Sequence, residues 1–162
     1  QAGIQLLATR PDVDPQRMAA AGASFGGYMV NWLAVHSHPF RCLVTHCGVW
    51  NLESMYGSTD ELWFADWEFG GPPWGASRPR DYDEFSPHRL ADRLKTPHLV
   101  IHNDLDYRCP IDQGLQLFTA LQTQGVPSRF LNFPDEGHWV LKPHNSLRWH
   151  REVFDFVAGY LK

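Results

Sequence analysis

The chain has 162 residues, of which 43% are hydrophobic and 20% are charged, which is typical of one folded domain with an ordinary core. Its formal net charge of -4 gives no electrostatic reason to expect nucleic acid as a partner. No apolar run is long enough to cross a membrane, so we expect neither a membrane span nor a signal peptide.

The first half of the chain alternates short apolar segments with amphipathic ones. A helix is expected over residues 4–8, where the prolines of RPDVDP end it, and a short buried strand over 18–23. A helix over 28–36 and a second strand over 42–47 follow. From 49 to about 90 the chain is rich in Trp, Gly and Pro, and we expect this stretch to be irregular.

The second half continues the alternation. A continuous apolar run predicts a third strand over 98–102, and apolar spacing predicts a helix over 111–124. A fourth strand is expected over 128–133 and an amphipathic closing helix over 146–161. Strands separated by helices indicate a parallel sheet covered on both faces. The predicted fold class is therefore α/β, with residues 1–162 as a single domain.

The stretch AAAGASFGGYM contains a Gly-x-Ser-x-Gly pattern centred on Ser24, with glycines at 22, 26 and 27. It falls between a predicted strand and a predicted helix, the place where such a turn can expose a nucleophilic serine. The turn is strained, so its neighbours are expected to be small. The helix that follows points its N-terminus at a forming oxyanion, and the N–H of Phe25 is placed to donate to it. The alternative is a tight turn with a spectator serine.

A serine hydroxyl needs a base to take its proton, and that base needs an orienting acid. The third strand is followed by NDLDYRCP, which offers Asp104 and Asp106, and the fourth by PDEGHW, which offers His138. The order Ser, Asp, His and the positions after parallel strands match the arrangement that open α/β sheets use for active sites. The pattern predicts a catalytic triad and leaves the choice of aspartate open.

Other groups of polar or aromatic residues have simpler explanations. His36 and His38 form a His-x-His pair, and His46 lies beside Cys47, but no compact set of three or four metal ligands is visible. We therefore expect no metal and no cofactor. The aromatic residues from Trp63 to Trp74 could form a lid over a pocket, although buried structural tryptophans are the commoner explanation.

Three segments resemble the prolyl oligopeptidase family of serine peptidases, most closely its acylaminoacyl-peptidase and dipeptidyl-peptidase-like branch. They are VDPQRMAAAGASFGGYM, LWFADWEFGGPPW and IHNDLDYRCPIDQGLQLFTALQTQGVPSRFLNFPDEGHWVLKPHNSLRWHREVF, which together cover nearly the whole chain. The resemblance implies an α/β-hydrolase fold with Ser24 as nucleophile and His138 as base. It favours Asp106 as the acid, because the family's aspartate precedes an x-Arg-x-Pro element.

The resemblance also implies substrate contacts. Arg108 would hold a backbone carbonyl of a bound peptide, a role that suits its planar, five-donor group. Phe25, Val49 and the region around Trp63 match the pocket beside the serine. Cys109 stands where the family usually has valine.

The chain departs from the family at its front. Family members carry a β-propeller and several strands before the nucleophile strand, whereas few residues precede Ser24 here. The resemblance therefore implies a C-terminal part of the catalytic domain whose nucleophile strand is a sheet edge. Such an edge would pair with a missing N-terminal portion, another chain or a second copy. The family's second oxyanion donor, a tyrosine, would also be missing, and losing one donor typically costs roughly 10²–10³ in turnover.

The predicted function is hydrolysis of peptide bonds through an acyl-enzyme, with release of an N-terminal dipeptide or an acyl-amino acid. One alternative is a carboxylesterase acting on short acyl esters, and activated esters are expected to react more easily than amides. The other is an inactive fragment that needs a partner chain.

Overall fold

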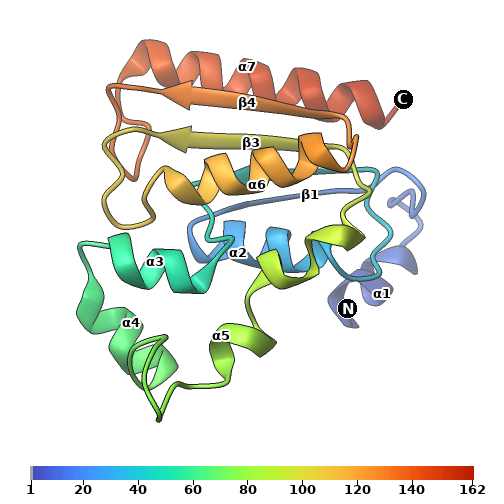
Figure 1. Cartoon of the computed structure of the whole chain (residues 1–162). Coiled ribbons are helices and arrows are strands. Elements are labelled where there is room, and N and C mark those ends of the chain that lie inside the picture. Colours follow the sequence, from blue (N-terminus) through green and yellow to red (C-terminus); the bar gives the residue numbers. More distant parts are fainter. Residues whose placement is uncertain (1) are drawn as a thin grey trace.

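The computed structural model describes residues 2–162 and contains a four-stranded sheet with the order β1-β2-β3-β4 (Figure 1). All three strand pairs are parallel. The strands are β1 (Ala19–Ala23), β2 (Cys42–His46), β3 (His98–Asn103) and β4 (Ser128–Phe133). Each strand matches the predicted segment to within one residue at either end, and the parallel α/β architecture is confirmed.

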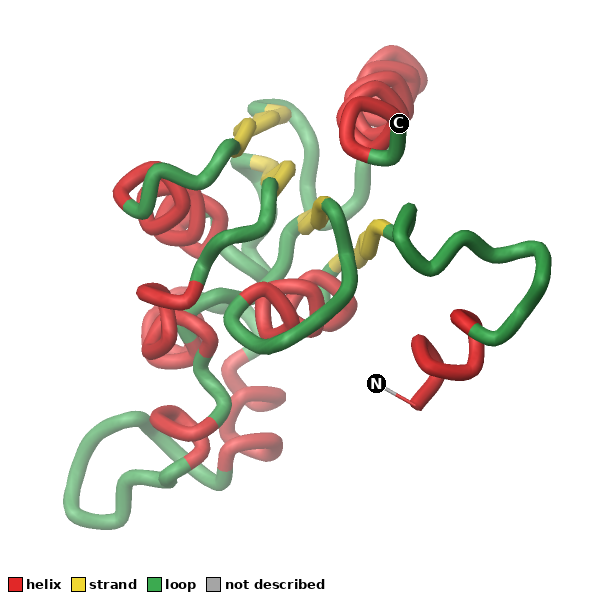
Figure 2. Tube along the Cα trace, turned by 90° about the vertical axis from the view of Figure 1, so that its right-hand side faces the viewer, coloured by secondary structure: helices red, strands yellow, loops and turns green. Residues whose placement is uncertain are grey.

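Helices cover both faces of the sheet, as Figure 2 shows in a view turned by 90°. Helices α2 (Phe25–Ala34) and α6 (Asp112–Thr123) lie on one face, and α7 (Pro143–Tyr160) lies on the other. Helix α2 begins three residues before the predicted start, directly after Ser24. Helix α7 also begins three residues early, because Pro143 suits the first turn of a helix.

The core is divided into two layers by the sheet. Every residue of β2 and of β3 is buried, and successive side chains point to opposite faces. Leu43 and Val100 therefore pack with Leu117 of α6, whereas Val44 and Leu99 belong to the cluster under α7. This double burial explains why the central strands are continuous apolar runs rather than alternating ones.

The prediction of an irregular stretch from 49 to 90 is wrong. It contains the helices α3 (Leu52–Ser58), α4 (Leu62–Phe69), α5 (Asp81–Glu84) and the 3₁₀ helix η1 (Pro87–Arg93). Helix α4 buries only Ala65 and exposes apolar side chains as well as polar ones. It therefore lacks the one-sided apolar spacing by which an amphipathic helix is recognised.

The expectation that the tryptophans of this stretch are buried is also wrong. Trp63, Trp67 and Trp74 are 70%, 83% and 60% exposed. Exposed aromatic side chains therefore gather on and beside α4, outside the buried clusters.

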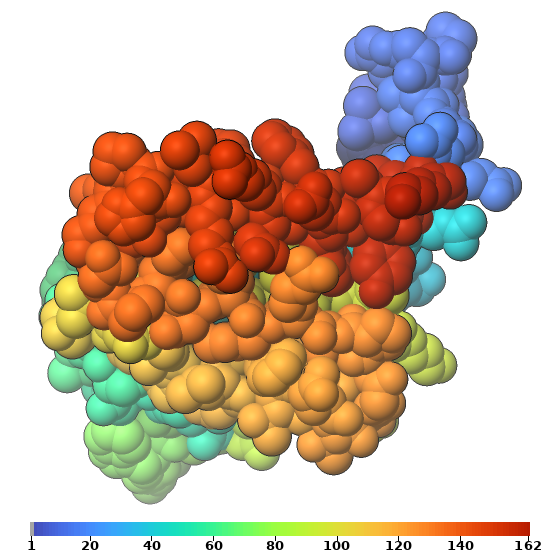
Figure 3. Space-filling model, turned by 90° about the horizontal axis from the view of Figure 1, so that it is seen from above, coloured from blue at the N-terminus to red at the C-terminus, as the bar shows by residue number. Residues whose placement is uncertain are grey.

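The N-terminal helix of the described chain contributes nothing to the buried core. Helix α1 (Ala2–Ala8) buries none of its residues, and Figure 3 shows the N-terminal segment, in blue, standing away from the rest.

Strand β1 lies at one edge of the sheet and β4 at the other. Among residues 2–162 no helix has the length and apolar character needed to cross a membrane.

Candidate active site

Ser24 occupies a strained turn between β1 and α2. Its backbone has φ 57° and ψ -121°, a combination that residues with a side chain rarely adopt and that is found at functional turns. The Ser24 N–H donates to the His46 carbonyl at 3.0 Å, which ties the turn to the end of the neighbouring strand. Ser24 therefore has both the strand-to-helix position predicted from the sequence and the strained backbone that is expected of a nucleophile elbow.

Glycine is needed at some positions around this turn and not at others. A Cβ at Gly22 would lie 2.1 Å from the Gly26 carbonyl oxygen, and one at Gly27 would lie 2.6 Å from the Cα of Gly48. A Cβ at Gly26 would meet nothing within 4 Å. The close approaches thus involve Gly22 and the pair Gly27–Gly48, which lets α2 begin directly against the end of β2.

The N-terminus of α2 supplies candidate oxyanion donors. Phe25 is the first residue of the helix, and the first N–H groups of a helix have no partner within it. These groups carry the positive end of the helix dipole. The Phe25 side chain is 69% exposed, so the ring extends outward while the backbone N–H stays at the turn.

Asp106 and His138 form a hydrogen-bonded pair. The Nδ1 atom of His138 lies 2.8 Å from Oδ2 of Asp106. The other carboxylate oxygen accepts hydrogen bonds from the N–H groups of Arg108 at 3.1 Å and Cys109 at 2.9 Å. The Asp106 side chain is fully buried and that of His138 is 10% exposed. Asp104 instead accepts from Asn132, so the structure brings Asp106, and not Asp104, to the histidine.

The environment keeps Asp106 ionised. Burial alone would raise its pKa, but hydrogen bonds from His138, the Cys47 thiol and the Cys109 N–H outweigh burial and lower the pKa below its usual value. An ionised carboxylate at Nδ1 leaves the Nε2 atom of His138 free to accept a proton, which is the tautomer a general base needs.

The segment 134–142, here called the base loop because it carries His138, is held by a buried carboxylate. Glu136 accepts hydrogen bonds from the N–H groups of Leu141 at 3.1 Å and Lys142 at 2.9 Å. The Asn145 amide donates to the same carboxylate at 2.8 Å. Glu136 thereby joins the base loop to the start of α7.

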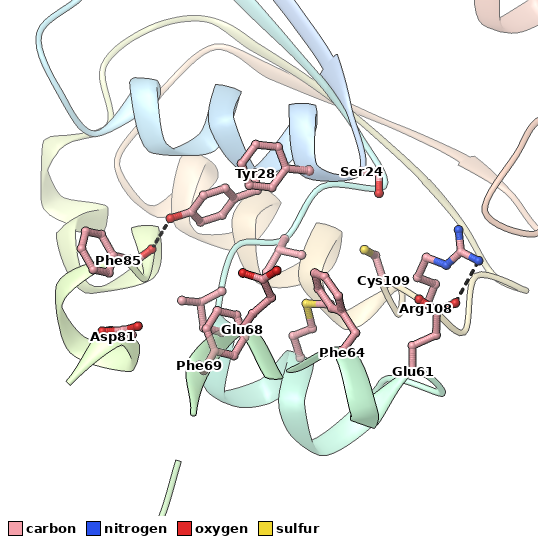
Figure 4. Close-up of a pocket in the computed structure, with 14 residues that line it drawn as sticks. Ser24, Tyr28, Glu61, Phe64, Glu68, Phe69, Asp81, Phe85, Arg108 and Cys109 are labelled. Carbon is pink, nitrogen blue, oxygen red and sulfur yellow. Dashed lines mark hydrogen bonds and ion pairs between the residues drawn. The ribbon is translucent and has the colours of Figure 1, made fainter. Parts of the chain in front are cut away.

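A cavity of about 530 Å³ opens beside Ser24 (Figure 4). Its wall is mostly apolar, with carboxylates at Glu61, Glu68 and Asp81. Arg108 also lines it and forms an ion pair with Glu61 at 3.0 Å. The Tyr28 hydroxyl donates to the Phe85 carbonyl at 2.8 Å. The remaining lining residues are Phe25, Val49, Leu52, Met55, Phe64, Phe69 and Cys109.

The cavity includes most of the residues that the sequence analysis assigns to substrate binding. Phe25, Val49 and Arg108 line it together with Ser24. Trp63 does not; its neighbour Phe64 takes that place, because consecutive residues of a helix point in different directions. Cys109 is buried on the cavity wall, and burial together with the charge of Asp106 raises the pKa of its thiol to about 12.

Several buried polar residues lie behind the site and are not predicted from the sequence. Gln113 accepts from the N–H groups of Trp50 and Asn51 at 3.0 and 2.9 Å, which fixes the segment that leads into α3. His102 and Asn103 end β3, and neither side chain is exposed. The signal that could reveal the latter two is their position, since they close an otherwise apolar strand just before the aspartates.

One group of side chains that includes Asp106 resembles a metal site in composition but does not fit a metal. Cys47, His102 and Asp106 bring ligand atoms within 4.8 Å of one another. However, Nε2 of His102 bonds to the Cys109 carbonyl at 2.7 Å, and burial raises the pKa of Cys47, so its thiol stays protonated. The Asp106 carboxylate is already occupied by its N–H donors and His138.

The chain is similar in sequence to known peptidases. A probable dipeptidyl-peptidase 5 of Emericella nidulans is 51% identical over 151 residues, covering 91% of this chain. Dipeptidyl-peptidase 5 of Porphyromonas gingivalis is 44% identical over 163 residues, covering 98%. The chain spans only 21% and 24% of the length of these relatives.

Solved structures show the same fold. An acylaminoacyl peptidase of Pyrococcus horikoshii superposes with a TM-score of 0.86 at 28% identity, over 98% of this chain and 26% of that one. A puromycin-hydrolyzing peptidase of Mycobacterium tuberculosis superposes with a TM-score of 0.89 at 28% identity, over 99% of this chain and 24% of that one. The arrangement of sheet and helices is thus that of the α/β-hydrolase peptidases. The family model for the prolyl oligopeptidase family matches residues 1–162, and the chain belongs to that family.

Proposed function

We propose that the protein is a serine peptidase in which Ser24 is the nucleophile, His138 the base and Asp106 the orienting acid. The observation that carries the proposal is the buried Asp106–His138 hydrogen bond of 2.8 Å, which lies beyond the carboxyl ends of the parallel strands, as does the strained Ser24 turn. Membership of the prolyl oligopeptidase family supports the same chemistry.

In the proposed mechanism, His138 Nε2 takes the Ser24 proton as the serine oxygen attacks the substrate carbonyl. The oxyanion accepts a hydrogen bond from the Phe25 N–H at the positive end of α2. His138 then gives its proton to the leaving amine, and water attacks the acyl-enzyme through the same base. Asp106 stays ionised and stabilises the imidazolium that forms in each step.

The cavity supports an apolar side chain next to the scissile bond. Val49, Leu52 and Phe64 supply apolar wall beside Ser24. We propose that Arg108 holds a backbone carbonyl of the peptide, because its guanidinium has five donors and Glu61 cannot engage all of them.

The proposed substrate is a peptide with a free amino terminus, from which a dipeptide is released. Glu68 and Asp81 line the cavity, and neither forms an ion pair within residues 2–162. Their charge favours a cationic amino terminus over an acylated one. Relatives named dipeptidyl-peptidase 5 support this choice, while the acylaminoacyl peptidases among the structural neighbours represent the other.

Covalent labelling with a fluorophosphonate probe tests the nucleophile. We expect the protein to be labelled and the Ser24→Ala variant to be unlabelled, because only an activated serine reacts with such a probe. A folded protein that takes up no probe would refute the proposal. Labelling that persists in Ser24→Ala would assign the nucleophile to another residue.

A matched substrate set then tests the specificity. Glycyl-aminoacyl and acetyl-aminoacyl p-nitroanilides that share the residue next to the scissile bond differ only in the ammonium group that replaces one hydrogen of the acetyl methyl. We expect faster release from the dipeptidyl compound. Turnover of p-nitrophenyl esters without release from either anilide would instead identify a carboxylesterase.

A further inference from the structure

His102 and Asn103 are buried polar residues at the end of β3 to which the mechanism above assigns no role. Neither is exposed. The Nε2 atom of His102 lies 2.7 Å from the Cys109 carbonyl oxygen. Because a carbonyl can only accept, Nε2 carries the hydrogen. Nδ1 has no partner among the described residues, and a Cβ at Gly114 would lie 2.6 Å from it. The ring is therefore closely confined.

Asn103 also donates to a backbone carbonyl, on the opposite face of the strand from His102. Its Nδ2 atom lies 2.6 Å from the Gly137 carbonyl oxygen, immediately before His138. The same nitrogen lies 3.4 Å from Nε2 of His46. Adjacent residues of a strand point to opposite faces, so the two side chains reach in different directions from one strand end.

The two contacts end on the two catalytic segments. Cys109 closes the segment 104–109, here called the acid loop because it carries Asp106, and its N–H donates to the Asp106 carboxylate at 2.9 Å. Gly137 belongs to the base loop. The backbones of these loops are also joined to each other, since the Leu105 N–H donates to the Glu136 carbonyl at 3.0 Å. The side chains of His102 and Asn103 add direct contacts from the end of β3 to Cys109, the last residue of the acid loop, and to Gly137, the residue before His138.

We propose that His102 and Asn103 are positioning residues: His102 fixes the acid loop and Asn103 fixes the base loop, so that Asp106 and His138 meet at hydrogen-bond distance. The catalytic meaning of this pair rests on the proposed function, whereas the positioning itself is a property of the fold. Displacing a catalytic group by about 1 Å can cost roughly 100-fold in rate. Loss of either contact is therefore expected to lower the rate at which Ser24 reacts.

Isosteric substitutions separate positioning from general stability. His102→Leu and Asn103→Leu remove the donors and keep apolar bulk. His98→Leu is the matched control, because His98 is an equally buried histidine at the other end of β3 whose Nε2 bonds to Thr45 at 2.8 Å and to neither loop. His102→Gln is the rescue variant, since its amide nitrogen can reach the position of Nε2. All variants are compared under conditions where circular dichroism shows them folded.

Two measurements are made on each variant. The first is the downfield proton resonance of the His138 Nδ1–H bonded to Asp106, which requires no turnover. The second is the second-order rate of fluorophosphonate labelling. We expect His102→Leu and Asn103→Leu to weaken or abolish the resonance and to slow labelling by about 10-fold or more. His98→Leu and His102→Gln are expected to keep the resonance and to label within about 3-fold of the unsubstituted protein.

The outcomes distinguish this inference from the proposed function. If both leucine variants keep the resonance and label as fast as His98→Leu, the positioning role is refuted. It is refuted as well if His98→Leu loses the resonance to the same extent, because the effect would then be general. An unsubstituted protein that shows the resonance but takes up no probe would refute the proposed function, and the resonance alone would then decide the positioning role.

Discussion

The glycines around Ser24 differ in whether the backbone leaves room for a side chain. The Gly-x-Ser-x-Gly pattern treats Gly22 and Gly26 alike, but only Gly22 faces the helix backbone, with a Cβ position 2.1 Å from the Gly26 carbonyl oxygen. Gly26 has open space where its Cβ would lie. We therefore expect Gly26 to tolerate alanine and Gly22 not to. The motif cannot distinguish them, because it requires glycine at both positions.

We predict that Gly22→Ala lowers the free energy of unfolding by about 3 kcal/mol or prevents folding, because a backbone contact of this kind cannot be relieved by a rotamer change. Gly26→Ala is the control, and it is expected to change the unfolding free energy by about 1 kcal/mol or less, since alanine favours a helix. Urea denaturation of both variants measures the difference. Equal effects would contradict the geometry of the turn.

The residues proposed for catalysis could be picked out from the sequence because each follows a strand in the order Ser, Asp, His. The choice between Asp104 and Asp106 could not be made from that order, because it depends on how the acid loop folds back towards His138. Likewise His102 and Asn103 belong to an apolar strand in the sequence, and their contacts with Cys109 and Gly137 are visible only in three dimensions. Pairings between loops leave no local pattern.

Among the helices, α4 presents two aromatic neighbours with different surroundings. Phe64 lines the cavity, whereas Trp63 is 70% exposed and does not. We predict that Phe64→Ala raises KM for substrates with a large apolar side chain by about 10-fold, the order expected when a buried aromatic contact is lost. Trp63→Ala is expected to leave KM within about 2-fold, as is usual for an exposed position. Steady-state kinetics with dipeptidyl anilides measure KM for both variants. A larger increase in KM for Trp63→Ala than for Phe64→Ala would contradict the assignment of Phe64 to the substrate pocket.

The elements that the sequence predicts well are those with a simple periodic pattern. Strands β2 and β3 are buried on both faces and are therefore continuous apolar runs, and α6 has a regular apolar stripe. The helices from 52 to 93 are short or lack such a stripe, as α4 shows, and their residues are rich in Gly, Pro and Trp. Their positions depend on tertiary contacts, such as those that Gln113 makes with Trp50 and Asn51. No local pattern could reveal them.

At the scale of the whole molecule, two buried histidines couple stability to pH. Burial lowers the pKa of His46 to about 4 and that of His98 to about 3, each from an ordinary value of 6.5. Both are therefore neutral in the folded protein at neutral pH. Their contribution to stability is present above pH 6.5 and is lost as the pH falls towards these lowered values, because the unfolded chain binds the protons first.

We predict that the free energy of unfolding falls by about 2 to 4 kcal/mol between pH 7 and pH 5, since each such group contributes up to about 1.4 kcal/mol per pH unit. Urea denaturation at several pH values measures the slope. The His98→Leu variant removes one of the groups, and its slope is expected to be shallower than that of the unsubstituted protein. An unfolding free energy that stays constant from pH 7 to pH 5 would contradict the assignment of buried, neutral histidines.

The order of the strands in the sheet has a consequence for synthesis of the protein on the ribosome. Strands β1 to β4 lie in the sheet in the same order as in the chain, so during synthesis, which delivers N-terminal segments first, each of them can add to the one made before it. Ser24 emerges directly after β1, whereas His138 follows β4. A growing chain therefore carries the proposed nucleophile long before its base has been made, and the serine stays unactivated until β4 and the base loop have folded against β3.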